Sequence, residues 1–336
     1  MRTTKIMNKQ EQRQTRLGLS SVNNLRKAKT SSFFVAATLI CALAFTSCNV
    51  NDDITDETSQ AVRFCASIDN QAVANAPETR AAGAAWNNGD AIGIFMVKNG
   101  TTTISEQAVN KPYTTQGAAT FTAAAGNEIY YPMNGSAVDF IAYYPYESGN
   151  VLTTAINVEI GTTQTTASQA GFDLLWARAD NSGNGYNKIS HAATPVAFVF
   201  NHKLAKIVMN CSADASVGTA LTGMTVTIKG MNTKNTFNLA TGVLGTPGTP
   251  AAITPHTVAD GAIYDAIIMP GGYATGALTV EFTVGGETFT WNVGAETFVA
   301  GNEYTYAITL TRTGVIVTGT INPWIPVVRD PVEAEG

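Results

Sequence analysis

The sequence of 336 residues has little charge, since Asp, Glu, Lys and Arg make up only 13% of it. Residues 1–47 hold eight of the 20 Lys and Arg residues and one of the 25 Asp and Glu residues, which leaves 12 basic against 24 acidic side chains downstream. A net charge of −12 in that part argues against nucleic acid as a partner, because phosphate backbones favour clustered Lys and Arg. It also argues against a folded part that lies flat on anionic lipid.

Histidine is scarce as well, with His191, His202 and His256 as its three residues. None has another His, Cys or carboxylate at metal-ligand spacing, so we expect no metal site. Neither a Gly-x-Ser-x-Gly elbow nor a Gly-rich phosphate loop occurs. Ser190 beside His191 would point to the opposite face of a strand, which excludes a catalytic dyad. We therefore expect no cofactor and no enzyme, with only the paired carboxylates of a glycoside hydrolase left open.

The segment DNSGNG, Asp180 to Gly185, resembles the first half of a calcium loop in its spacing of oxygen-bearing residues. Position 12 of such a loop would be His191, where a bidentate Glu is required, and helical flanks are missing. We interpret the segment as a Gly- and Asn-rich loop between strands.

The sequence also lacks a hydrophobic run that is long enough to span a bilayer permanently. Phe33 to Phe45 has the length of a secretory h-region and follows a basic segment. Phe45-Thr46-Ser47-Cys48 then resembles a bacterial lipobox, which predicts a lipoprotein signal peptide over residues 1–47 and acylation of Cys48. Two buried acyl chains would hold the protein on a membrane durably. The alternative is an ordinary signal peptide with an incidental cysteine.

An acidic run, with Asn51-Asp52-Asp53 and Asp56-Glu57, follows Cys48 directly. We interpret residues 48–60 as a tether between membrane and folded domain, because charged polar stretches seldom fold. Such a run also resembles a signal for display on the outer face of the outer membrane. Of the remaining cysteines, Cys65 and Cys211 lie in strand-like runs and are interpreted as small buried thiols, with a disulfide left open.

A sustained helical stripe is absent after residue 60, and alternation of period two takes its place. In LTVEFTV, Leu278, Val280, Phe282 and Val284 share one face, which predicts a strand with one buried side. The same reasoning predicts strands over residues 62–68, 91–97, 138–144, 195–200, 206–211, 224–230, 262–269, 278–284, 287–293, 304–312 and 314–321. Many short strands separated by Gly- and Asn-rich turns favour an all-β fold of antiparallel sandwiches.

A polar, Gly- and Asn-rich stretch over residues 179–195 predicts a division into an N-terminal β-sandwich, residues 61–194, and a C-terminal β-sandwich, residues 195–336. Residues 241–256 are interpreted as a long loop of the second domain. Aromatic residues cluster in IYYP (129–132) and YYPYE (143–147), with Trp176 in FDLLWA. Flat rings could form a carbohydrate platform, but packing in the core is the preferred interpretation.

Seven motifs occur in order along the chain, and together they resemble the fimbrillin-like family of lipoproteins, which are subunits of type V pili and related surface proteins. They are WNNGDAIGIFM (86–96), VDFIAYYPY (138–146), FDLLWA (172–177), FVFNHKLAKIVM (198–209), AIYDAIIMPG (262–271), GNEYTYAITL (301–310) and INPW (321–324). The resemblance implies two transthyretin-like β-sandwich domains. It also implies export as a lipoprotein, trimming by an arginine-specific protease and assembly by strand exchange between subunits.

The bond between Arg80 and Ala81, in APETRAAG, resembles the family's processing site, and the alternative is a solvated linker residue. Trimming there would open a groove that residues 314–328 of another subunit, the same or a paralogue, could fill. We expect a surface-exposed fimbrial subunit or adhesin, anchored in the outer membrane by lipid, with a host or bacterial surface as a further ligand. The alternative is a monomeric glycan-binding lipoprotein.

Overall fold

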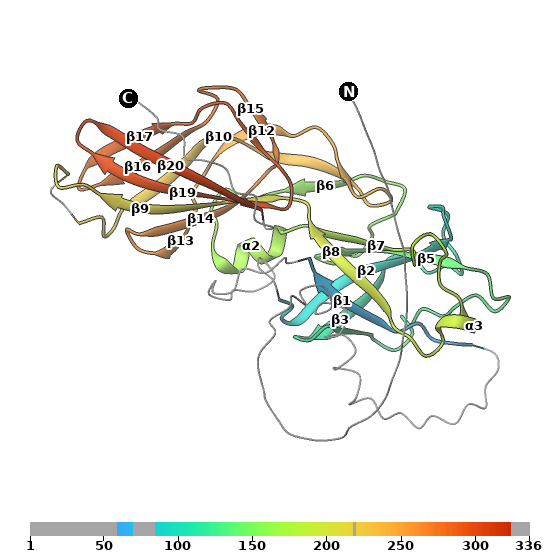
Figure 1. Ribbon diagram of the computed structural model, residues 1–336. Coiled ribbons are helices and arrows are strands. Elements are labelled where there is room, and N and C mark those ends of the chain that lie inside the picture. The colour runs from blue at the N-terminus through green and yellow to red at the C-terminus, as the bar shows by residue number, and fades with distance from the viewer. Residues whose placement is uncertain (1–58, 70–84, 218–219, 324–336) are drawn as a thin grey trace, which may run out of the picture. The chain divides into compact units, whose positions relative to one another are not determined.

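The computed structural model describes residues 59–69, 85–217 and 220–323, and this part of the chain consists largely of β-strands (Figure 1). The only helices within it are two short ones, α2 (Thr166–Phe172) and α3 (Lys188–His191). The predicted all-β class is therefore confirmed. Across these described residues, no helix combines the length and the apolar character needed to cross a lipid bilayer.

Seven strands form a sheet that closes on itself, called the ring below. Their order is β1-β4-β3-β2-β5-β7-β8, and the ring closes because β1 pairs with both β4 and β8. The strands are β1 (Phe64–Ile68), β2 (Asn88–Lys98), β3 (Lys111–Gln116), β4 (Thr120–Ala123), β5 (Val138–Tyr144), β7 (Leu175–Ala179) and β8 (Val196–His202).

Two further sheets share one hydrophobic core, in which Trp291 of one sheet packs against Tyr306 of the other with ring centroids 4.8 Å apart. The first has the order β11-β10-β16-β17, with β6 and β12 also paired to β10, and the second has the order β13-β14-β9-β19-β20. A small pair, β15–β18, completes the described strands. Their bounds are β6 (Ile156–Glu159), β9 (Ala205–Ala213), β10 (Thr225–Asn238), β11 (Val243–Leu244), β12 (Gly248–Ile253), β13 (His256–Ala259), β14 (Ile263–Ile268), β15 (Gly271–Tyr273), β16 (Thr279–Val284), β17 (Glu287–Asn292), β18 (Glu296–Phe298), β19 (Asn302–Thr311) and β20 (Gly314–Pro323).

Strand β5 is buried along its whole length, because its two faces belong to two different cores. Phe140 and Tyr144 point into the core of the ring, whereas Ile141 and Tyr143 belong to the core of the two further sheets. Strand β2 is divided in the same way. Burial on both faces explains why AIGIFMV is a continuous apolar run and why VDFIAYY is apolar at every position except Asp139. The buried Asp139 carboxylate forms an ion pair with Arg178 and accepts the N–H of Gly100.

Each strand predicted from the sequence is present, and Leu278, Val280, Phe282 and Val284 all face the core as predicted. Pairing is antiparallel except between β1 and β8 and between β9 and β19, which run parallel. The interpretation of residues 241–256 as a loop is wrong, because β11 and β12 lie there and pair with β10. The sequence pattern does not reveal these strands, because Gly and Pro are typical of loops. Pro250 is nevertheless compatible with β12, since edge strands tolerate Pro.

The chain passes from the ring to the later sheets between His202 and Ala205. Pro195 directly precedes β8, which is a strand of the ring, and the polar stretch before it holds α3, turns and an isolated β-bridge from Tyr186 to Val138 of β5. In the other direction, β6 leaves the order of the ring and pairs with β10. The division into two separate domains stays a prediction.

Candidate assembly interface

Strand β1 is held in the ring by its backbone on both edges. It pairs with β8 along its whole length and with β4 at Phe64 and Cys65. Just before the strand, the Val62 N–H donates to the carbonyl oxygen of Ile129 at 2.8 Å. Backbone pairing of this kind recognises an extended strand and not particular side chains.

Alternate side chains of the β1 segment point into the core of the ring. They are Val62, Phe64, Ala66 and Ile68, none of them more than 6% exposed. The Phe64 ring lies 5.0 Å from Tyr113, 5.1 Å from Phe140 and 5.6 Å from Phe198, measured between centroids. Complete burial of one such side chain stabilises a fold by about 1.5–3 kcal/mol. Removal of β1 would therefore leave a hydrophobic groove between β4 and β8.

Trp86 also contacts β1. In the sequence it follows residues 70–84, which lie outside the described part of the chain. Its indole Nε1–H donates to the carbonyl oxygen of Ala66 at 3.0 Å. The indole packs edge-on against Phe121, Tyr144 and Phe200, with centroids 5.1–5.6 Å away. Trp86 is therefore fixed by the ring itself and bonds to the strand that fills the groove.

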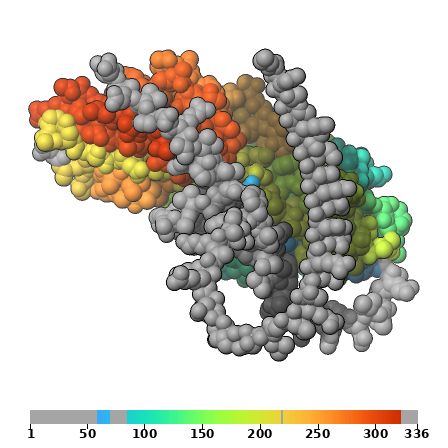
Figure 2. All heavy atoms as spheres, in the orientation of Figure 1, coloured from blue at the N-terminus to red at the C-terminus, as the bar shows by residue number. Residues whose placement is uncertain are grey.

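Strand β20, near the other end of the described chain, forms the edge of a sheet. It pairs with β19 from Gly314 to Pro323, and no described strand pairs with its other edge. Of its described side chains only Val317 is buried, and Ile316 is 52% exposed. The late strands, coloured orange to red, reach the surface in the space-filling view (Figure 2). The strand carries no charged residue, and Pro323 at its end is the one residue in it of a kind that usually blocks an edge strand from further pairing.

Cys48, Arg80 and Ala81 lie outside the described residues, so lipidation and trimming stay predictions. Cys65 is buried in β1, and Cys211 is half-buried in β9, on a strand of a different sheet. Burial raises the pKa of the Cys211 thiol to about 12, which keeps it protonated and unreactive at neutral pH.

The clustered tyrosines pack inside the protein and do not form an outer platform. Tyr131, Tyr143 and Tyr144 are at most 5% exposed, and only Tyr130 of this group is substantially open to solvent. The Tyr143 hydroxyl donates to Asn110 Oδ1 at 2.9 Å. The interpretation as core residues is confirmed for Tyr131, Tyr143 and Tyr144, whereas Tyr146 and Trp176 are half-buried.

Ser190 and His191 do not point to opposite faces, which corrects the strand assumption made for them. Both lie in α3, and Ser190 Oγ is 3.2 Å from His191 Nδ1. The hydroxyl is also 3.0 Å from Oδ1 of Asn187, the residue that caps the helix, so it takes part in a capping arrangement. The segment Asp180–Gly185 forms a turn closed by a 2.8 Å backbone bond between its end residues. Within the described ranges, no group of three or more His, Cys, Asp and Glu residues could hold a metal ion.

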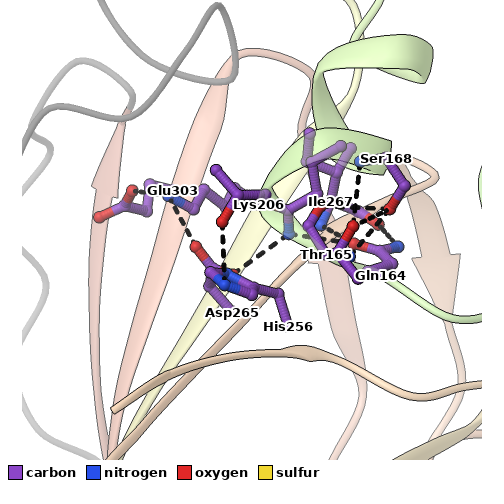
Figure 3. A network of polar contacts seen from close by, with 10 residues as sticks. Gln164, Thr165, Ser168, Lys206, His256, Asp265, Ile267 and Glu303 are labelled. Atoms are coloured by element: carbon purple, nitrogen blue, oxygen red, sulfur yellow. Dashed lines mark hydrogen bonds and ion pairs between the residues drawn. The ribbon is translucent and has the colours of Figure 1, made fainter.

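A network of polar side chains fastens the segment around α2 to the sheet that contains β14 (Figure 3). The Gln164 side chain bonds the backbone of Ile267 twice, since its Nε2 donates to the carbonyl oxygen and its Oε1 accepts from the N–H, both at 2.8 Å. Beside it, Asp265 accepts from Gln169 at 3.2 Å, lies 2.9 Å from His256 Nδ1 and forms an ion pair with Lys206 at 3.3 Å. Sequence reasoning missed this network because its members are scattered and follow no spacing.

Residues 79–324 match the fimbrillin-like family. The chain belongs to this family. Among its relatives is a protein of Bacteroides uniformis described as "putative fimbrium subunit Fim1C", 38% identical over 269 residues, which are 74% of this chain and 82% of that protein.

This fimbrillin-like chain is also similar to two solved structures, each described as a "putative cell adhesion protein". The structure from Bacteroides uniformis has 33% identity, a TM-score of 0.64 and coverage of 79% of this chain and 98% of that one. The structure from Bacteroides ovatus has 26% identity, a TM-score of 0.63 and coverage of 81% and 100%.

Proposed function

We propose that this chain is a non-catalytic fimbrial subunit or adhesin that assembles by exchange of the strand in the β1 position. The observation that carries the proposal is that β1 fills a hydrophobic groove in the ring, yet is joined to β2 only through a segment that holds Arg80. Cleavage after Arg80 would free β1 from the rest of the chain. A strand from another subunit could then restore both the backbone pairing and the core.

Residues 314–328 of a neighbouring subunit are the proposed donor. The described part of this segment is paired on one edge only and buries little of its side-chain surface, so its release costs less than the release of a central strand. The names of the fimbrium subunit and the cell adhesion proteins similar to this chain support such an assembly role. A division into two transthyretin-like sandwich domains belongs to the same proposal.

Acylation of Cys48 would anchor the subunit in the outer membrane, with residues 48–60 as the tether to a fimbrium on the cell surface. Other fimbrial subunits are the proposed partners, and a host or bacterial surface is the further ligand of an adhesin. Replacement of Cys48 by Ala should abolish labelling of the protein by a fatty-acid probe in cells. Unchanged labelling would show that the acyl chains are attached to another residue.

Size-exclusion chromatography of soluble protein that starts at Asn49, before and after arginine-specific cleavage, tests the assembly proposal. We expect multimers after cleavage, and a monomer when the chain is truncated after Thr313. The matched control is Arg80→Lys, which leaves the other arginines as protease sites and should stay monomeric. The proposal is wrong if cleaved wild-type protein remains a monomer or if the truncated form multimerises equally well.

A further inference from the structure

We infer that the β1 position accepts only a strand with a very small residue at the place of Ala66, and that Trp86 fixes this register by bonding the strand's backbone. The partner is β20 of a second copy of this chain, with Gly319 at the Ala66 position. The inference rests on the proposed function, because it concerns the strand that replaces β1.

The environment of Ala66 limits the size of the side chain there. Ala66 is 1% exposed and lies opposite Phe198 in the parallel pairing with β8. Its carbonyl oxygen accepts the indole N–H of Trp86, and that indole is enclosed by three aromatic rings. Ala66 belongs to the buried core of the ring, so a larger side chain there would have to displace packed neighbours, and such overpacking destabilises a core. The inward residues of the β1 segment therefore read large, large, small, large, in the order Val62, Phe64, Ala66 and Ile68.

Strand β20 repeats this order on its own inward face. That face consists of Val315, Val317, Gly319 and Ile321, which lie opposite Leu310, Ile308, Tyr306 and Tyr304 of β19. Alignment in the direction of β1 brings Gly319 to the Ala66 position and Val317 to the Phe64 position. The outward residue Thr320 then takes the place of Ser67, which is exposed to solvent.

Other alignments fit the groove less well. A shift by two residues one way brings Val317 to the Ala66 position and Gly319 to the pocket that now holds Ile68. The opposite shift brings Ile321 to the Ala66 position and Gly319 to the pocket that now holds Phe64. The cavity left there would be destabilising. The reverse direction brings Pro323, which has no N–H, to the part of the groove where the Val62 N–H donates to Ile129.

Trp86 suits a role in fixing the register because it follows Arg80 in the sequence and so stays with the trimmed subunit. Its hydrogen bond goes to a backbone carbonyl, so any strand can make this bond if its side chain at that place is small enough. Trp86 thus holds the strand's backbone at this one residue, and the packing around the indole admits only a small side chain there, so the two together fix the register.

Gly319 cannot be tested by substitution within the chain alone. A Cβ atom there would lie 2.9 Å from the Tyr306 ring, so a larger residue would also disturb the pairing of β20 with β19. Synthetic peptides of residues 313–323 separate the two effects, because only the groove then meets the changed residue.

The experiment uses protein that starts at Asn49 and carries a site for a sequence-specific protease in place of residues 74–80, so it does not depend on Arg80. After cleavage, release of the β1 fragment by added peptide is followed by chromatography. We expect the wild-type and Gly319→Ala peptides to displace the fragment, and the Gly319→Val peptide to be about tenfold weaker or more. Thr320→Val, the matched control on the outward face, should displace it as well as the wild type does. Trp86→Phe is measured by direct binding of labelled peptide to protein from which the β1 fragment has been removed, because the fragment itself uses the Trp86 bond. It should weaken all active peptides by a similar factor of about five to ten.

The outcomes separate the inference from the function on which it rests. If no peptide displaces the fragment, exchange by the C-terminal strand fails and the register rule fails with it. If the Gly319→Val peptide displaces the fragment as well as the wild type does, exchange stands and the register rule is wrong. If Thr320→Val weakens displacement more than Gly319→Val, the strand enters with its opposite face inward, which also overturns the rule. If Trp86→Phe leaves the direct affinities of the peptides for protein without β1 unchanged, the role given to Trp86 is wrong.

Discussion

Strands β1 and β20 lie near opposite ends of the described chain and are held in contrasting ways. β1 pairs on both edges, and its four inward side chains, from Val62 to Ile68, are buried. β20 pairs on one edge, and of its described side chains only Val317 is buried. The β1 position is therefore costly to leave empty, whereas β20 buries only Val317 fully and packs Val315 and Ile321 partly against the core. A molecule in which an empty β1 position is unfavourable and β20 is only partly buried is suited to strand exchange between copies.

Alanine substitutions on β1 and β20 should give the largest difference in the free energy of unfolding. Phe64→Ala removes a ring that contacts three other aromatic rings, so we expect the free energy of unfolding to fall by about 3–5 kcal/mol. Val317→Ala removes two methyl groups from an edge strand and should cost about 1–2 kcal/mol. Urea denaturation followed by circular dichroism measures both values.

Ser67→Ala is the matched control on β1, because this side chain points outward and is exposed. It should change the free energy of unfolding by less than about 0.5 kcal/mol. Equal losses for Phe64→Ala and Val317→Ala would contradict the contrast between the two strands.

The sequence is sufficient to predict each strand whose side chains alternate or form an unbroken apolar run. LTVEFTV shows its buried face directly, and VDFIAYY is recognisable because burial on both faces keeps every position except Asp139 apolar. β12 is not predictable in this way, because it begins in GTPGTP and gains its strand form from pairing with β10. Tertiary pairing overrides weak local preference in such segments.

The interface is less predictable than the strands. That residues 62–68 form a strand follows from their pattern, but the parallel pairing of β1 with β8 joins segments far apart in the sequence. The hydrogen bond between Trp86 and Ala66 joins residues that are 20 apart in the sequence, and it forms because the ring closes around β1. In the same way, the two bonds from Gln164 to Ile267 span 103 residues, and no spacing rule connects an amide to a strand at that distance.

Gln164→Ala tests whether the ring and the later sheets unfold as one unit. The substitution leaves the buried N–H and C=O of Ile267 without the amide that now bonds them, so we expect a loss of about 2–3 kcal/mol. Gln164→Glu loses the donor for the C=O and brings a buried carboxylate against it, so it should cost at least as much as alanine. Differential scanning calorimetry should show the single transition of the wild type split in Gln164→Ala. No splitting and no loss of stability would show that this network does not join the two regions.

The smallest effect concerns Tyr113, whose ring packs against Phe64 beneath β1. Burial raises the pKa of Tyr113 from 10.0 to about 12, although its hydroxyl accepts the N–H of Ile129 at 2.9 Å, which works in the opposite direction. In the unfolded chain the hydroxyl ionises near pH 10 and in the folded chain near pH 12. Stability from this group is therefore complete below pH 10 and is lost as pH rises toward 12.

We expect urea midpoints to show wild type losing about 1 kcal/mol more than Tyr113→Phe between pH 9 and pH 11, since each pH unit in this window carries about 1.4 kcal/mol. Tyr131 and Tyr306, whose pKa values burial also raises, remain in both proteins and cancel in the comparison. Cleaved protein from which β1 has been removed should lose the difference, because Tyr113 is then open to solvent. A difference between wild type and Tyr113→Phe that stays constant from pH 9 to pH 11 would contradict a closed ring around Tyr113. A difference that persists after β1 is removed would show that the ring stays closed without its strand, and β1 would then be no more costly to lose than β20.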